Sequence, residues 1–358
     1  MAASPHLPRL ATQLFPGCGI PYENDAINCG KLNLVQAAIV SEGSSGRDHV
    51  QQSVLKIHAI VNLRAGTALG MQPETIRAVL ERAFAATGHQ VSVECVPPEE
   101  VERAISHAVS TSIDVLVIGG GDGTIRTAAK YLIGTGTALG ILPLGTMNRV
   151  AKDLEIPLRL EDAAAYLADA TPIQIDVAKV NGSIFLCNSV MGTTLRYSVA
   201  RARLRGRPAL NRIPKYLATI RNILSSRRTI AIVVDNGEER LGIRALSVVV
   251  TNNGYDETTP WLRRPKLDGG KLTMYVSKHR SGWGMAKALA RAIIGSWHGD
   301  PEMAKLTGSS FVIHAKNRRK RLANDGELGK FDMPLRYEVM PRALTVLTKG
   351  ASDLSQKD

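Results

Sequence analysis

The sequence has few of the residues that would build a disulfide scaffold, a structural metal site or a membrane span. Its 358 residues include four cysteines, which show no paired metal-ligand spacing and are too few for a disulfide scaffold, so we interpret them as reduced thiols. No apolar run approaches the about 18 residues of a membrane span. Segment 34–40 is too short and too poorly flanked for a signal peptide. These absences predict a globular protein of the cytosol.

Aromatic residues and, in one long stretch, acidic residues are also scarce. Only 4% of the chain is aromatic, so the stacking surfaces of single-strand nucleic-acid binders are not evident and no nucleic-acid partner is expected. The net charge of +13 indicates an acidic partner. No Asp or Glu occurs between Val177 and Val234, which predicts one strongly positive face. The basic residues of that stretch are Lys179, Arg196, Arg201, Arg203, Arg205, Arg207, Arg212, Lys215, Arg221, Arg227 and Arg228.

The order of apolar segments predicts two domains, because a single core does not usually grow to this chain length. Over 55–173, short apolar strands alternate with amphipathic helices, which is typical of a Rossmann-like α/β domain. Over 174–349, short segments rich in β-formers are separated by Asn, Gly and Asp, which predicts an all-β sandwich or barrel. We expect residues 1–54 to be a weakly ordered extension and 350–358 a tail. A return of the last strands to the first domain stays open.

A glycine-rich turn follows an apolar strand at 118–124, in the letters IGGGDGT. Glycine allows a ligand to approach the main chain closely, and helix N-termini offer free N–H groups to anions. The turn is therefore either a phosphate site or a plain, tight strand-to-helix connection. It is not the dinucleotide fingerprint, because Thr124 stands where the last glycine would be, and the chain contains no P-loop lysine motif.

A second turn, PLGTMN at 143–148, ends the next predicted strand. The side chains of Thr146 and Asn148 either cap the helix that follows or hydrogen-bond phosphate or sugar oxygens. Two such turns in successive units of one parallel sheet would face a common crevice.

Taken together, GGDGT (120–124) and PLGTMN (143–148) resemble the diacylglycerol kinase catalytic domain family of lipid kinases. The resemblance extends, in order, over roughly residues 55 to 349. The further matching segments are IVNLRAG (60–66), IDVAKV (175–180), RRPKLDGGKL (263–272) and NDGELG (324–329).

The resemblance implies an ATP- and Mg²⁺-dependent kinase that phosphorylates a lipid hydroxyl, of diacylglycerol or sphingosine type, in the cleft between its two domains. Asp122 would organise Mg²⁺ and the phosphates or serve as the base, and Glu327 is the other candidate for the base. Asp268, in the Asp-Gly turn, is a further candidate metal ligand. The residues that would contact the nucleotide are Asn62, Gly66, Gly120, Gly121, Gly123, Thr124, Thr146 and Asn148.

The sequence departs from the family pattern at three positions. Leu63 stands where the family usually has Pro, Thr67 where a basic residue often follows, and Arg149 where an acid is common. Because the acid at 149 would belong to a carboxylate network near the metal, a nucleotide- or lipid-binding regulator with weakened catalysis is one alternative. An enzyme similar to NAD kinase, which shares GGDGT, is the other.

The basic stretch predicts contact with a membrane. In the segment 211–228, apolar residues fall on one stripe of a helix and basic residues elsewhere, which fits an anionic membrane surface. The alternative is a helix packed against its own domain. We thus expect a lipid substrate and an anionic membrane as partners, with peripheral membrane association, and leave a homodimer open. The candidate membrane residues are Arg201, Arg203, Arg205, Arg207, Arg212 and Lys215.

Overall fold

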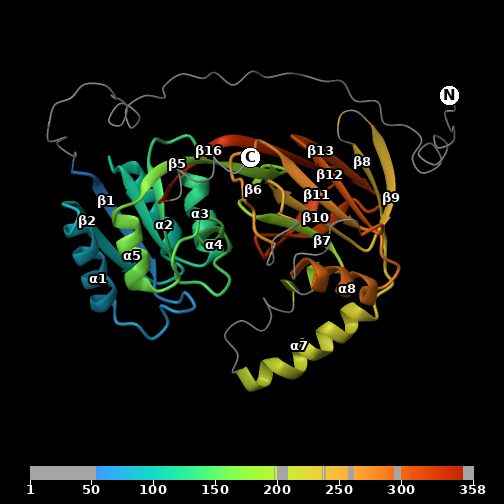
Figure 1. Cartoon of the computed structure of the whole chain (residues 1–358), viewed down its shortest axis with the longest axis horizontal. Coiled ribbons are helices and arrows are strands. Elements are labelled where there is room, and N and C mark those ends of the chain that lie inside the picture. Colours follow the sequence, from blue (N-terminus) through green and yellow to red (C-terminus); the bar gives the residue numbers. More distant parts are fainter. Residues whose placement is uncertain are drawn as a thin grey trace.

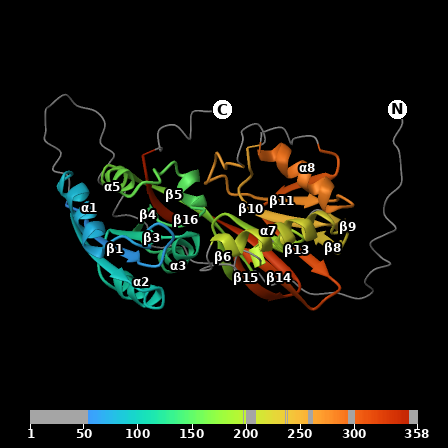
Figure 2. The same cartoon turned by 90° about the horizontal axis from the view of Figure 1, so that it is seen from below.

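The structure is a computed structural model in which two domains lie side by side (Figures 1 and 2). It describes the chain from residue 54 to residue 349, except for 197, 200–208, 236, 238, 257–261 and 294–299. The α/β domain comes first and the β domain second, which confirms the predicted fold class. Apart from Val54, the predicted extension and the predicted tail lie outside the described residues.

The α/β domain consists of four parallel strands with helices between and after them. Its elements are β1 (Lys56–Asn62), α1 (Pro73–Ala85), β2 (Gln90–Val96), α2 (Val101–Ser110), β3 (Val115–Gly120), α3 (Asp122–Leu132), β4 (Ala138–Pro143), α4 (Arg149–Asp153) and α5 (Leu160–Ala168). Every residue of β3 and β4 is buried, because helices cover both faces of the sheet. In α1, Pro73 occupies the first turn, where its missing N–H costs nothing, and Ile76, Leu80 and Phe84 form the buried face.

The β domain is built from two sheets with a helix pair beside them. Its elements are β5 (Thr171–Val180), β6 (Ser183–Phe185), β7 (Asn188–Gly192), α7 (Ala209–Leu224), β8 (Ile230–Asp235), β9 (Arg240–Ala245), β10 (Ser247–Asn252), β11 (Leu272–Ser277), α8 (Gly282–Ile293), β12 (Met303–Gly308), β13 (Ser310–Ala315), β14 (Arg319–Asn324), β15 (Glu327–Asp332) and β16 (Leu335–Thr348). Six strands form one sheet in the order β12-β11-β10-β7-β14-β15.

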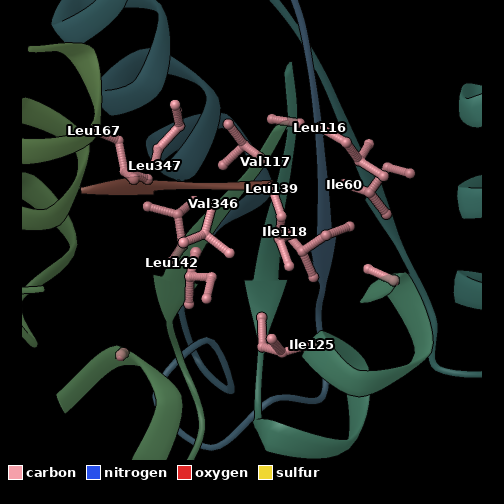
Figure 3. Packing of buried hydrophobic residues seen from close by; sticks show 14 of the residues in the cluster. Ile60, Leu116, Val117, Ile118, Ile125, Leu139, Leu142, Leu167, Val346 and Leu347 are labelled. Atoms are coloured by element: carbon pink, nitrogen blue, oxygen red, sulfur yellow. The ribbon is translucent and has the colours of Figure 1, made fainter. Parts of the chain in front are cut away.

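The other sheet is shared by both domains. Its main path runs β2-β1-β3-β4-β16-β13-β8-β9, with β5 paired to β16. The last strand therefore returns to the α/β domain, where Val346 pairs in parallel with Leu139 of β4. Val346 and Leu347 pack into the α/β core beside Leu139, Leu142 and Leu167 (Figure 3). The two domains are thus connected by hydrogen-bonded strands.

A buried carboxylate fastens the crossing between the domains. Asp176 of β5 is fully buried and accepts hydrogen bonds from the backbone N–H groups of Gly270 (2.7 Å) and Arg342 (2.9 Å) and from Nδ2 of Asn253 (3.0 Å). The register of the β5–β16 pair shifts between Met340 and Leu344, and Arg342 in that bulge has a φ of 51°. The Asp176 side chain therefore stabilises the bulge in the long β5–β16 strand pair.

The helix pair α7 and α8 lies beside the two sheets, with α7 as the lowest element of Figure 1. The sequence predicted a helix over α7, whereas α8 was not predicted. Three large apolar side chains of the pair are exposed, namely Leu217 (61%) and Ile220 (44%) on α7 and Trp283 (62%) on α8. Within the described residues, no helix has the length and apolar character needed to cross a bilayer.

Replacing Asp176 by Asn should destabilise the fold. The amide keeps the size of the carboxylate but turns an N–H₂ group toward groups that are themselves donors, so we expect a loss of about 2 to 3 kcal/mol in the free energy of unfolding. Urea denaturation followed by circular dichroism measures this loss. Asp235→Asn is the control, since Asp235 also accepts from a backbone N–H, that of Gly237, but lies near the surface. Equal stability of Asp176→Asn and the wild type would contradict the prediction.

Candidate active site between the two domains

Three turns come together at the carboxyl-terminal edge of the parallel sheet. They follow β1, β3 and β4, and each links a strand to the next helical segment. Nδ2 of Asn62 donates to Oγ1 of Thr124 (3.4 Å), which joins the first turn to the second. The N–H of Thr67 donates to the carbonyl of Leu144 (2.9 Å), which joins the first turn to the third. These residues thus form the edge of the sheet at which ligands of open α/β folds bind.

The second and third turns touch through their glycines. A Cβ atom added to Gly145 would lie 2.4 Å from Cα of Gly121, and one added to Gly120 would lie 2.6 Å from Cβ of Thr124. Any larger residue at 145 would push the two backbones apart. Gly145 is therefore required by close backbone approach, and Gly120 by the adjacent Thr124 side chain, whereas a Cβ on Gly121 would lie 3.4 Å from Cα of Gly145, an ordinary contact.

The third turn is held by Asn148. Its Nδ2 donates to the carbonyls of Pro143 (2.8 Å) and Gly145 (2.9 Å), and its own φ is 50°. Both donated hydrogen bonds of the Asn148 amide therefore stay within the turn. Its side chain makes no capping hydrogen bond to α4. Thr146 is exposed, and its Oγ1 lies 3.3 Å from where a Cβ of Gly66 would be. The predicted residues Gly66 and Thr146 are thus neighbours.

Asp122 connects two of the turns. It is the first residue of α3, and its Oδ1 accepts a hydrogen bond from the backbone N–H of Arg149 (2.7 Å), the first residue of α4. The N-terminus of α3 has no side-chain cap at Gly121, so its first N–H groups are left for another acceptor. An acidic residue at this end of a helix is also favoured by the helix dipole.

Glu327 reaches the same helix from the β domain. It begins β15 after a two-residue turn, and its Oε1 lies 2.7 Å from where a Cβ of Gly123 would be. Oε2 of Glu327 is 4.0 Å from Nη2 of Arg126, whose Nη1 donates to the backbone carbonyl of Asn324 (2.9 Å). The two predicted catalytic carboxylates therefore stand at successive residues of one helix N-terminus, Asp122 within it and Glu327 against Gly123.

The turn before Glu327 is anchored by Asp325. Its buried carboxylate accepts from the backbone N–H groups of Leu186 (2.7 Å), Cys187 (2.8 Å) and Asn188 (3.0 Å). Burial raises the pKa of Asp325, although these three hydrogen bonds lower it. Sequence reasoning did not single out Asp325, although an aspartate before glycine between two strands is a turn signal.

A buried ion pair, which no sequence pattern predicted, joins the domains next to the site. Nε of Arg264 in the β domain donates to Oδ2 of Asp153 in α4 (3.0 Å), and Nη1 donates to the carbonyl of Leu186 (2.7 Å). Arg149, the residue where an acid was expected, lies in the same region. Its pKa is raised, mainly through the charge interaction with Tyr255 and further by Cys187.

The candidate metal ligands do not form a closed metal site. Asp268 is half exposed and pairs with Arg342 at 3.8 Å. Across the described part of the chain, no three His, Cys, Asp or Glu residues are grouped so as to hold an ion. Mg²⁺ is commonly held by one or two carboxylates together with substrate phosphates and water. This description fits the site. The Asp122 carboxylate, with Glu327 nearby, would contact a Mg²⁺ that arrives with phosphate, and the free N–H groups of the turns would donate to the phosphate.

The positive face is only partly described. Arg201, Arg203, Arg205 and Arg207 lie outside the described residues. Arg212 and Lys215 fall in α7, where Lys215 is exposed.

Known proteins share both the sequence motifs and the fold. Residues 56–180 match the model of the diacylglycerol kinase catalytic domain. A protein of Yersinia pestis strain Pestoides F named "Probable lipid kinase YegS-like" is 35% identical over 97 residues, which are 26% of this chain and 33% of the relative. A protein of the same name from Yersinia pseudotuberculosis gives the same values. The chain thus spans about a third of the length of the curated relatives it matches.

Solved structures cover more of the chain. The crystal structure of a diacylglycerol kinase from Bacillus anthracis strain Sterne has a TM-score of 0.65 at 19% identity and covers 84% of this chain and 99% of that one. Another solved chain from that organism has a TM-score of 0.67 at 21% identity. The fold is therefore shared over both domains. Residues 56–180 are thus similar in sequence to the diacylglycerol kinase catalytic domain family.

Proposed function

We propose that the protein transfers the γ-phosphoryl group of ATP to the hydroxyl of a lipid in the cleft between its domains. The observation that carries this proposal is the meeting of Asp122 and Glu327, from different domains, at the N-terminus of α3. Phosphoryl transfer requires positioning, charge neutralisation and a carboxylate near the attacking hydroxyl. The similarity of residues 56–180 to the diacylglycerol kinase catalytic domain supports the same reaction.

The phosphates of ATP would bind where the turns meet. Main-chain N–H groups of Gly121, Gly123 and Thr124 at the start of α3 would donate to phosphate oxygens, with Thr146 beside them. Mg²⁺, when bound by Asp122 and the phosphates, would neutralise charge that develops on the oxygens. Asn62 would keep the first turn in place through its contact with Thr124.

Glu327 would act on the acceptor. The lipid hydroxyl oxygen attacks the γ-phosphorus, the bond from that phosphorus to the β–γ bridging oxygen breaks, and ADP leaves with the electron pair. Glu327 accepts the hydroxyl proton. Because Arg126 lies 4.0 Å from one oxygen of Glu327 and donates to the backbone carbonyl of Asn324 nearby, Arg126 would help to hold the carboxylate in place.

The helix pair would bring the cleft to a membrane that carries anionic lipid. Leu217, Ile220 and Trp283 are exposed, and Lys215 and Arg221 on α7 are exposed among them. Apolar side chains that insert and cations that face headgroups are the two parts of an interfacial helix. No acid lies between Val177 and Val234, so this surface carries no opposing charge of its own.

Replacing Gly145 by Ala should weaken ATP binding. The new methyl group would lie 2.4 Å from Cα of Gly121, so the second and third turns must separate. Overpacking of this kind costs about 1–3 kcal/mol, and we expect about a tenfold or greater loss of ATP affinity by calorimetry. Gly136→Ala is the matched control in the same domain, since nothing lies within 4 Å of its Cβ. Unchanged affinity in a folded Gly145→Ala protein would remove these turns from the nucleotide site.

Asp122→Asn and Glu327→Gln should each lower turnover far more than ATP affinity. Loss of a general base costs roughly 10²-fold or more. Transfer from radiolabelled ATP to a panel of lipid alcohols measures turnover, and calorimetry measures binding. Glu338→Gln, a surface glutamate of β16 paired with Lys179, is the control. Full activity of Glu327→Gln would assign the base elsewhere, and ATP binding without any transfer by the wild type would favour the regulator.

Changing Arg201, Arg203, Arg205 and Arg207 together to Gln should reduce binding to anionic liposomes strongly and leave ATP affinity unchanged. Each cation contributes about 1 kcal/mol near such a surface, within a Debye length of about 10 Å at 0.1 M salt. Sedimentation with anionic and neutral vesicles over a salt series measures this effect.

Replacing Leu217 and Ile220 together by Ser should weaken the part of the liposome binding that persists at high salt. Leu158→Ser is the control, because Leu158 is similarly exposed (49%) but belongs to the α/β domain. Equal binding of the wild type to neutral and anionic vesicles at all salt concentrations would exclude the membrane proposal.

A further inference from the structure

A buried polar cluster lies where the chain passes from β11 of the six-stranded sheet to α8. His279, two residues after β11 and three before α8, is 3% exposed. Its Nδ1 is 3.0 Å from Oγ of Ser277. Its Nε2 lies 3.6 Å from Oδ2 of Asp300 and 3.5 Å from Oε2 of Glu302. One imidazole is therefore enclosed by a hydroxyl and two carboxylates.

Asp300 is the member of the cluster that most needs a positive charge beside it. Its side chain is buried, and its Oδ1 accepts the backbone N–H of Glu302 (2.9 Å). Among the residues that the structure describes, the partner of Oδ2 is the imidazole of His279. A buried carboxylate without a cation is costly, because burial removes its water. Histidine changes its charge between about pH 5 and 8, so it supplies that cation only when it is protonated.

The other charged side chains of the elements around His279 are exposed to solvent. They are Lys278 and Arg280, next to it in the chain, Lys287 and Arg291 of α8, and Lys305 of β12. Helix α7, which contacts α8, contains no acidic residue. The two carboxylates are therefore the groups that respond to the charge of the imidazole.

The first turn of α8 rests on this cluster. A Cβ atom added to Gly284 would lie 2.8 Å from Cδ2 of His279, so this turn lies directly on the imidazole ring. The N–H of Gly282 donates to the carbonyl of Ser226 (2.9 Å), just after the end of α7. Trp283 stands between the two glycines and is 62% exposed. The contacts of His279 thus position the turn that carries an exposed apolar side chain of the helix pair (Figure 1).

We infer that His279, Asp300 and Glu302 form a proton-dependent clasp that holds α8 in place, so that the helix pair binds an anionic membrane more tightly at about pH 6 than at about pH 8. A protonated imidazole attracts both carboxylates and closes the clasp. A neutral imidazole leaves the buried Asp300 without a cation, so the stabilisation is present at low pH and is lost as the pH rises. The inference rests on the proposed membrane binding and adds a regulation to it. An anionic membrane also concentrates protons at its surface, which favours the closed clasp.

Hydrogen exchange of α8 at two pH values tests the clasp in solution. After correction for the intrinsic pH dependence of exchange, the α8 amides of the wild type should be protected about tenfold or more better at pH 6 than at pH 8, because opening the clasp leaves a buried charge unpaired. Helix α3 of the α/β domain is the internal reference and should show no such change. Equal protection of α8 at both pH values would overturn the inference.

Substitutions in the clasp should remove or shift this pH dependence. His279→Gln should leave α8 poorly protected at both pH values, and Asp300→Asn should make the protection independent of pH, because the buried group is then neutral. Glu302→Gln changes a half-exposed side chain, so it keeps the test decisive if a buried substitution prevents folding, and it should move the midpoint to lower pH. His58→Gln is the matched control, since Nε2 of His58 also lies 3.5 Å from a glutamate, Glu94, but belongs to β1.

Sedimentation with vesicles of phosphatidylglycerol and phosphatidylcholine tests the consequence for membrane binding. The wild type and His58→Gln should bind about tenfold or more tightly at pH 6 than at pH 8, whereas His279→Gln should bind at pH 6 nearly as weakly as the wild type does at pH 8. No vesicle binding by the wild type at either pH would overturn the membrane proposal and this inference with it. Binding by His279→Gln that keeps the full pH dependence of the wild type would overturn the inference alone.

Discussion

The candidate site depends on the rigid crossing between the two domains, and that crossing depends on the carboxylate of Asp176. The strand pair β5–β16 runs through both domains, and its register shift would leave the N–H of Arg342 without a partner if Asp176 did not accept it. The same carboxylate bonds Gly270 and Asn253. The hairpin that carries Glu327 belongs to the six-stranded sheet, which packs against the shared sheet, and Glu327 lies against Gly123 of α3.

This geometry changes how the two carboxylates can work together. The sequence placed Asp122 and Glu327 in different domains. In the structure Glu327 already lies against Gly123, and a side chain larger than hydrogen at 123 would collide with it. Movement of the domains is therefore not required to bring the proposed base to the turns that we propose bind phosphate.

The sequence predicted elements whose signals lie within a few residues, and it could not predict contacts between residues that are far apart in the chain. Alternating apolar strands and helices, with glycines at strand ends, predicted the α/β domain and its turns, because each of these signals lies within a few residues. Arg264 was missed, and so were two local features, Asp325 and the helix α8. Arg264 meets Asp153 across more than a hundred positions of chain, and no pattern near either residue signals the pair. Asp268 matched a motif, yet its pairing with Arg342 depends on the bulge of a distant strand.

The charges around the site explain why Arg149 is compatible with it. The backbone N–H of Arg149 bonds Asp122, so the residue contributes to the turn through an atom that any residue except proline would supply. Its guanidinium interacts electrostatically with Tyr255 and Cys187 and with the ion pair formed by Arg264 and Asp153. An acid at 149 would add a second negative charge there, whereas an arginine adds a positive one. If ATP binds at these turns as proposed, a cation beside the α3 turn would favour its binding, because ATP carries several negative charges, and the loss of the acid would affect chiefly how a metal is held.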